Sequence, residues 1–238
     1  MQSAARADGR VQSQLRPFRA EPAALARADG SARWAQGGTE VLVSVNGPCE
    51  VRRARERIDE ATIEVIMRPM AGLPGPVERE LEQLLCQTLE HLVLTADHPR
   101  TAISVVVQVL ANDGALLAAS LHGATLALVH AGVPMRGLLG ACTVGVLPHG
   151  TVILDPSADE ERAALAIATL AYVVRRCASG AYDRKLVLSH VCGCLASADQ
   201  YDVCLSAAQE AAICAVEFER TAVARTVAPA PAAPGRGE

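Results

Sequence analysis

Short apolar runs rich in valine and isoleucine recur along the chain, and they predict β-strands. The runs lie at residues 39–46, 61–68, 101–110, 141–147, 151–154, 164–174 and 185–195. Longer segments with helical spacing separate several of them. The pattern therefore favours a mixed α/β (α+β) domain with helices packed on sheets.

Three segments predict helices. Residues 76–94 carry leucines at steps of three and four, and Pro76 suits a first helical turn. The stretch 114–135 has no formal charge, but its histidines, glycines and proline favour a buried helix at 116–131 over a membrane span. Residues 198–221 predict a last helix whose apolar stripe is Val203, Ala207, Ala211 and Cys214, widened by Ala208 and Ala212.

Composition narrows the class of protein. Half of the 238 residues are hydrophobic and the net charge is −4, which excludes a polycationic nucleic-acid coat, so any RNA contact needs a local basic patch. The N-terminus lacks the pattern of a signal peptide, and the eight cysteines fit reduced core thiols of the cytosol or nucleus. The Ala/Pro/Gly-rich residues 225–238 predict a disordered tail.

Several short motifs follow one another in a characteristic order. They are RADGR at 6–10, LRP at 15–17, ADGSA at 28–32, GGTEVLV at 37–43, VNGP at 45–48 and PRT at 99–101. In this order the chain resembles the RNase PH family, whose members use inorganic phosphate to cleave RNA. The strings at 63–69, 72–75, 98–101 and 131–136 are most similar to those of the ring subunits of the eukaryotic RNA exosome core.

The resemblance implies an RNase PH-like domain over residues 6–224, after a flexible N-terminus at 1–5. It further implies a ring of six such subunits, with other RNase PH-like subunits, cap subunits and RNA as partners, no membrane, and a possible homodimer of the isolated chain. Its implied location is the nucleus, including the nucleolus, and the cytoplasm, where such rings process ribosomal RNA.

Residues 113–120 depart from the family pattern. Phosphorolytic members read DGGTRTAS here, whereas this chain reads DGALLAAS. An arginine fork can bind phosphate through two parallel hydrogen bonds, and leucine donates none. Ala115, Leu116 and Leu117 therefore predict a degenerate phosphate site. Repeated arginines of catalytic relatives fall on Gln83, Gln87 and Glu90 of the helix at 76–94, which points the same way.

Asp155 and Glu161 match a pair of acidic residues that family enzymes keep beside the scissile phosphate. Their oxygens suit a magnesium ion. The favoured alternative is structural: Ser157 starts a short helix with Asp159, Glu160 and Glu161 in its first turn. No cofactor and no resident metal are expected.

Arg52, Arg53, Arg55 and Arg57 are candidates for RNA contact, for pairing with an acidic neighbour subunit, or for a solvated charge run, since acidic residues are interleaved. Arg100 favours a structural role. A zinc site is disfavoured by the C-x-C spacing, so buried small hydrophobes are the preferred interpretation of its candidates, His190, Cys192, Cys194 and Cys204.

These observations predict a structural, RNA-facing ring subunit without phosphorolytic activity. A metal-dependent nuclease of RNA or DNA, using Asp155 and Glu161 and acting as a homodimer, is the alternative. A plain RNA-binding module is a third hypothesis, for which we expect only weak affinity of the isolated chain.

Overall fold

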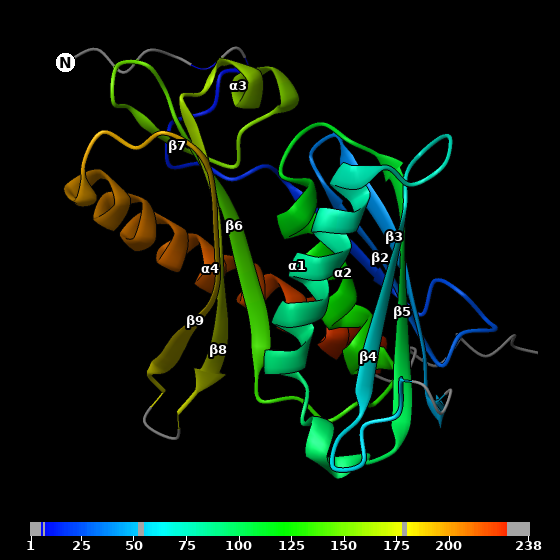
Figure 1. Cartoon of the computed structure of the whole chain (residues 1–238). Coiled ribbons are helices and arrows are strands. Elements are labelled where there is room, and N and C mark those ends of the chain that lie inside the picture. Colours follow the sequence, from blue (N-terminus) through cyan, green and yellow to red (C-terminus); the bar gives the residue numbers. More distant parts are fainter. Residues whose placement is uncertain (1–5, 7, 52–54, 178–179, 228–238) are drawn as a thin grey trace, which may run out of the picture.

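The computed structural model describes residues 6, 8–51, 55–177 and 180–227 and arranges them in two β-sheets and four α-helices (Figure 1). The first sheet has the strand order β1-β2-β3-β5-β4, in which β4 and β5 run parallel and all other neighbours antiparallel. Its strands are β1 (Phe18–Pro22), β2 (Gly30–Gln36), β3 (Thr39–Glu50), β4 (Thr62–Arg68) and β5 (Thr101–Ala111).

The second sheet is antiparallel, with the strand order β7-β6-β8-β9. Its strands are β6 (Leu138–Val146), β7 (Val152–Leu154), β8 (Ala166–Arg176) and β9 (Tyr182–Gly193). The helices are α1 (Pro76–Leu92), α2 (Leu116–His130), α3 (Ala158–Ala163) and α4 (Ala198–Val227), and a short 3-10 turn covers Thr95–Asp97. The predicted mixed α/β class is confirmed.

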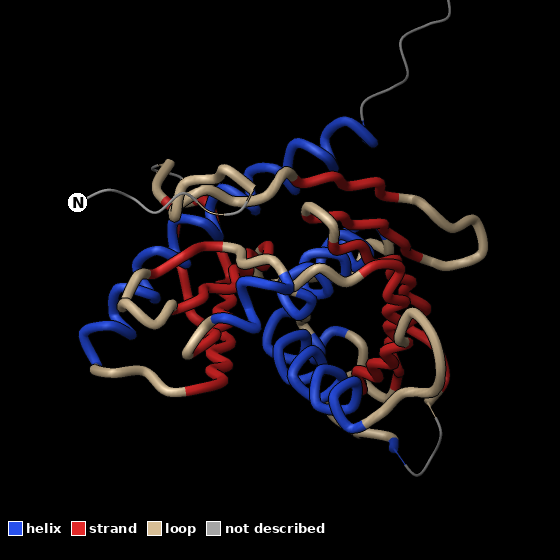
Figure 2. Tube along the Cα trace, turned by 90° about the horizontal axis from the view of Figure 1, so that it is seen from above, coloured by secondary structure: helices blue, strands red, loops and turns tan. Residues whose placement is uncertain are grey.

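Helices α1 and α2 lie between the two sheets, and α4 covers the opposite face of the second sheet (Figures 1 and 2). Because sheets flank α2 on both sides, every residue from 117 to 128 is buried. At Gly123 a Cβ would lie 2.8 Å from Cγ2 of Val43, so glycine allows α2 to approach β3 closely. Within the described residues, no helix is long and apolar enough to cross a membrane.

The first sheet buries one face and exposes the other. Val41, Val43 and Val45 of β3 are fully buried against the helices, as alternation along a strand requires. On the outer face, Ile66 is 41% exposed and Leu110 is 37% exposed. The outer face of this sheet therefore exposes apolar side chains to solvent.

The strand predictions hold with shifts of a few residues at their ends, but β1 and β2 were not predicted. Both strands are rich in alanine, arginine and other residues with weak strand preference, and β1 ends in a proline. Only the pairing of β1 with β2, and of β2 with β3, makes these segments strands.

The predicted apolar stripe of α4 is confirmed at Ala208, Ala211 and Ala212, which are buried, but it was wrong at Val203 and Cys214. Val203 is 54% exposed and Cys214 is exposed. The helix turns its alanine-rich side to β6, where a Cβ at Gly140 would lie 2.4 Å from the carbonyl oxygen of Ala212. The buried residues of this side include Cys204, Ala208, Ala211, Ala212, Ala215 and Val216.

Candidate functional site: the loop before α2

The loop between β5 and α2 contains the predicted degenerate phosphate site. Gly114 and Ala115 both have a positive φ, +82° and +53°, so the backbone turns sharply before the helix begins. The hydroxyl of Thr39 donates to the Gly114 carbonyl at 2.6 Å and accepts the Asp113 N–H at 2.9 Å. The side chain of Thr39 thus fixes the loop against β3.

The side chains that follow this turn are apolar and cannot bind an anion. Leu117 is only 5% exposed and belongs to the main hydrophobic core, and Leu116 packs against the same core. Neither they nor Ala115 can donate a hydrogen bond through a side chain. Only backbone N–H groups of this loop could contact an anion.

One of these N–H groups is already engaged. The Ala115 N–H donates to Oε1 of Glu161 at 2.7 Å. The Glu161 carboxylate therefore lies at the N-terminus of α2, where the helix dipole favours a negative charge. Burial raises the pKa of Glu161, and the negative charges of Asp155 and Asp113 act in the same direction, while the Ala115 N–H and Arg16 oppose them.

This raised pKa gives a pH-dependent prediction for Glu161→Gln. A carboxyl group whose pKa is raised by folding stabilises the protein most below the ordinary value near pH 4.5, and this contribution is lost as the pH rises through the folded pKa. Glutamine has no such titration, yet its carbonyl can still accept the Ala115 N–H. As the pH rises from about 4 to about 7, we therefore expect the free energy of unfolding of the variant to increase relative to that of the wild type.

Denaturant unfolding of both proteins at each pH measures this difference. A constant difference across the range would contradict the assignment of a buried, destabilised charge to Glu161.

Asp155 is fully buried, and its carboxylate is held mainly by Arg16, with Nη1 of Arg10 4.0 Å from Oδ2. Its Oδ2 accepts from the backbone N–H and Nε of Arg16 at 2.9 and 3.0 Å, and its Oδ1 accepts from Nη2 at 2.6 Å. The same guanidinium donates to the carbonyls of Asp113 and Gly114 at 2.6 and 3.2 Å. Arg16 thus ties the segment after β7 to the loop before α2.

A second arginine supports the same corner. Nε of Arg6 donates to Oε1 of Glu160 at 2.7 Å, and its other nitrogens bond the carbonyls of Leu154 and Asp155 at 2.7 and 3.0 Å. The hydrogen bond from Arg6 is the main cause of the lowered pKa of Glu160. The predicted short helix is confirmed, with Ser157 as its N-cap and Asp159, Glu160 and Glu161 in its first turn.

The structure brings Asp155 and Glu161 to the same corner but gives each a structural partner, Arg16 and the Ala115 N–H respectively. Among the described residues there is no group of three or more His, Cys, Asp or Glu side chains that could hold a metal ion. This geometry favours the structural interpretation of the acidic pair.

The positions on α1 that carry arginine in catalytic relatives are at the surface. Gln83 and Gln87 are exposed, and Glu90 is half-buried and pairs with Arg57 at 3.2 Å. Two amides and one carboxylate therefore face solvent on this helix.

The arginines predicted to contact RNA are partly accounted for. Arg52 and Arg53 lie outside the described residues. Arg55 pairs with Glu64 at 2.9 Å, and Arg57 pairs with Glu60 at 2.9 Å as well as with Glu90. Arg100, at the start of β5, is exposed and lies 3.7 Å from Glu56.

The cysteine interpretation needs correction. Cys204 is buried in α4 as expected, but Cys192 and Cys194 are exposed at the end of β9. Nε2 of His190 lies 3.6 Å from Sγ of Cys192 and 3.4 Å from Oε1 of Glu80. The expectation of reduced core thiols was also too broad, since Cys49, Cys177 and Cys214 are exposed too. The error arose because β9 is an edge strand with an exposed end.

A buried polar pair in the core was not predicted from the sequence. Nδ1 of His122, on α2, lies 2.7 Å from Oε1 of Glu219, on α4, and both side chains are fully inaccessible. The other ring nitrogen lies 2.9 Å from the Ala141 carbonyl, and the ring stacks on Trp34 with centroids 4.7 Å apart. A lone histidine and a glutamate 97 residues apart carry no local signal of such a contact.

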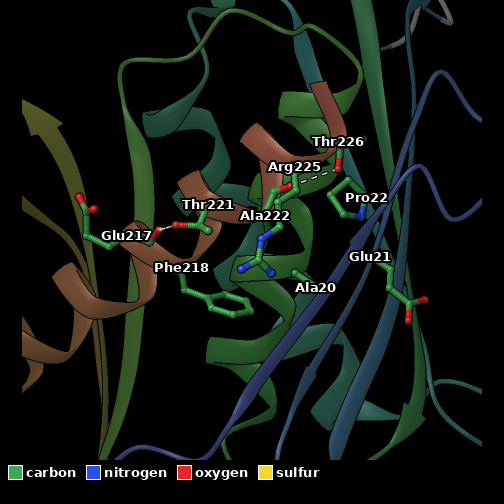
Figure 3. A pocket seen from close by; sticks show the side chains of 9 residues that line it. All are labelled: Ala20, Glu21, Pro22, Glu217, Phe218, Thr221, Ala222, Arg225 and Thr226. Atoms are coloured by element: carbon green, nitrogen blue, oxygen red, sulfur yellow. Dashed lines mark hydrogen bonds between the residues drawn. The ribbon is translucent and has the colours of Figure 1, made fainter. Parts of the chain in front are cut away.

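A separate hollow of about 540 Å³ lies between β1 and the last turns of α4 (Figure 3). Ala20 and Phe218 form apolar wall, and Arg225 lies in the hollow beside Thr221 (Figure 3). The hydroxyls of Thr221 and Thr226 are occupied by helix carbonyls. This hollow contains none of the predicted site residues.

Comparison with known proteins matches two family models in succession. Residues 14–134 match the 3' exoribonuclease family, domain 1, and residues 137–211 match domain 2 of the same family. The boundary between the two models falls between α2 and β6.

Similar proteins include a rice protein (Oryza sativa subsp. japonica) named exosome complex exonuclease RRP46 homolog, which is 46% identical over 167 residues, or 70% of each chain. Human exosome complex component RRP41 is 40% identical over 169 residues, covering 66% of this chain and 69% of the relative. The crystal structure of rice Rrp46 superposes with a TM-score of 0.82 at 40% identity, covering 91% of this chain and 99% of the other. An archaeal exosome core chain, at 22% identity and a TM-score of 0.73, shares the fold.

Proposed function

The chain belongs to the 3' exoribonuclease (RNase PH) family, and from this premise we propose that it is a structural subunit of the RNA exosome core ring without phosphorolytic activity of its own. In this role it supports 3'-to-5' RNA processing and degradation, including ribosomal RNA maturation, in the nucleus, nucleolus and cytoplasm. The names of its relatives support the assembly, since they are exosome complex proteins.

One observation carries the non-catalytic part of the proposal. The loop before α2 donates a backbone N–H to the protein's own Glu161, while Leu116 and Leu117 fill the core where an anion-binding side chain would stand. Phosphoryl transfer depends almost entirely on positioning and charge stabilisation. A loop that carries no guanidinium of its own, and whose N–H is bound by a carboxylate, supplies little of either.

The surface supports assembly with other RNase PH-like subunits. Ile66 and Leu110 are exposed on the outer face of the first sheet, and Leu42 and Val106 lie on the same face. Strands β1 and β4 form the edges of this sheet, and unpaired strand edges favour association. We propose that these surfaces contact neighbouring ring subunits, with cap subunits and RNA as further partners.

Activity is tested on the purified chain with a labelled single-stranded RNA, with and without phosphate and magnesium. We expect no phosphate-dependent shortening. Phosphate-dependent cleavage that Glu161→Ala or Asp155→Asn abolishes would contradict the proposal, and magnesium-dependent, phosphate-independent cleavage would favour a nuclease. The assay is needed because the rice relative is named an exonuclease.

Assembly is tested by recovering the tagged protein from its own cells and identifying stoichiometric partners. We expect other RNase PH-like chains. Recovery of none would contradict the ring assignment independently of the activity assay.

A further inference from the structure

A groove of about 500 Å³ lies between the C-terminal end of α1, the start of β6 and the β8–β9 hairpin. Its cationic side chains are Arg136, Arg175 and Lys185, and His91 of α1 lies at its wall. All four of these residues are exposed. The groove floor contains the side chains of Val173 and Val187, which belong to the main core.

Within the part of the chain that the structure describes, the three cations of this groove have no ion-pair partner, and Nε of Arg175 donates to the Arg136 carbonyl. Among the described residues, no carboxylate lies within 4.0 Å of the charged nitrogens of Arg136, Arg175 or Lys185. Two carboxylates line the groove. Glu90 is paired with Arg57, and Asp183 forms no ion pair with any described residue. In a protein of net charge −4, such unpaired cations at one groove are not explained by overall composition.

The hairpin places these cations on one face by strand alternation. Val173 and Arg175 of β8 face Lys185 and Asp183 of β9 in register, on the side of α1. Val174 packs instead in the core below α4, and its neighbours Arg176 and Arg184 share that side. The Tyr182 hydroxyl, on the same side, donates to Glu217 of α4. The hairpin therefore carries two separate sets of cations.

The groove also meets a region singled out from the sequence. Glu90 lies at its wall and binds Arg57, one of the arginines predicted to contact RNA. Glu90 thus joins Arg57 to the wall of the groove at the end of α1.

We propose that this groove binds the phosphate backbone of single-stranded RNA, through Arg136, Arg175 and Lys185. The inference rests on the proposed function, which places RNA at this protein. Arginine and lysine contacts to phosphates give affinity without reading sequence. No Phe, Tyr or Trp side chain lines the groove, and His91 alone offers a ring for base stacking, so binding is expected to depend little on sequence and steeply on salt.

The decisive variant is the groove triple, Arg136→Gln, Arg175→Gln and Lys185→Gln. Its matched control is the opposite-face triple, Arg176→Gln, Arg184→Gln and Arg220→Gln, which removes the same charge from the α4 side. Binding of a labelled, mixed-sequence RNA by the full chain is measured by fluorescence anisotropy from about 25 to 200 mM salt. Matching melting temperatures establish that both variants fold.

We expect the groove triple to bind about tenfold or more weakly at about 50 mM salt, and its salt slope to be shallower by about 2, since each single-strand phosphate contact contributes about 0.7. The opposite-face triple should bind within about threefold of the wild type, because it removes only long-range charge. Equal losses in both triples, or no measurable binding by the wild type, would overturn the proposal.

Lys185 offers a direct readout because it is the only lysine of the chain. Amine acetylation, followed by mass spectrometry, should show protection of Lys185 when RNA is added and no change at the N-terminal amine. Unchanged acetylation would overturn the proposal.

Recovery of ring partners by both triples separates this inference from the proposed function. If the groove triple keeps RNA binding but loses its RNase PH-like partners, the groove is a protein interface and the inference fails while the ring assignment stands. If no variant recovers ring partners but the groove triple still loses RNA binding, the ring assignment fails and the inference that the groove binds RNA stands.

Discussion

Replacing Arg16 by methionine is expected to lower the free energy of unfolding by about 3–5 kcal/mol, the usual cost of leaving one partner of a buried ion pair without the other. The Asp155 carboxylate is fully buried and takes three hydrogen bonds from Arg16. Methionine retains much of the side-chain volume and the backbone N–H bond, but it removes both guanidinium contacts. Unfolding in urea, monitored by circular dichroism, measures the loss.

Two further variants show whether charge or geometry is responsible. Arg16→Lys keeps the charge but not the fork, so it should lie between the wild type and Arg16→Met. Adding Asp155→Asn to Arg16→Met should recover part of the loss, since no unpaired charge then remains in the core. A loss below about 1 kcal/mol for Arg16→Met would show that solvent reaches Asp155 and that the pair is not structural.

Replacing Glu219 by leucine is expected to cost about 2–4 kcal/mol, because Nδ1 of the buried His122 loses its only hydrogen-bond partner. Glu219→Gln should cost much less. With Nε2 of His122 facing the Ala141 carbonyl, this nitrogen carries a hydrogen and Nδ1 of the neutral ring can accept from the glutamine amide. Thermal and denaturant unfolding of the two variants gives the comparison.

A local probe of this pair is built into the core. Trp34 is the only tryptophan of the chain and stacks on the His122 ring. We expect the emission of Trp34 to change in Glu219→Leu and to stay near that of the wild type in Glu219→Gln. Equal stability and emission in all three proteins would show that the pair does not connect α4 to α2.

The class of fold follows from local pattern, because most strands of this protein are continuous apolar runs and α1 has a clear leucine stripe. Strands β1 and β2 lack such a run, and their pairing is decided by β3. The stripe of α4 was wrong at Val203 and Cys214 because apolar residues lie on several sides of this helix, and the close approach to Gly140 decides which side is buried.

The motif comparison identified the residues of the candidate site but not their contacts. Arg16 was part of a matching string, yet its partner Asp155 lies 139 residues further along the chain. Leu117 could be recognised as a missing donor, whereas the engagement of Ala115 by Glu161 depends on how α3 packs against the loop. The groove cations could not be predicted from the sequence, because only the register of the β8–β9 hairpin places the neighbouring Arg175 and Arg176 on opposite faces.

Helix α2 belongs to the first matched family domain, yet its buried flanks contact strands of both sheets. A cut between residues 134 and 137 would remove the second sheet from one flank and expose leucine and alanine side chains to water. The family models divide this chain in two, but both halves bury apolar surface against the same helix. We therefore expect neither half to keep a closed hydrophobic core without the other.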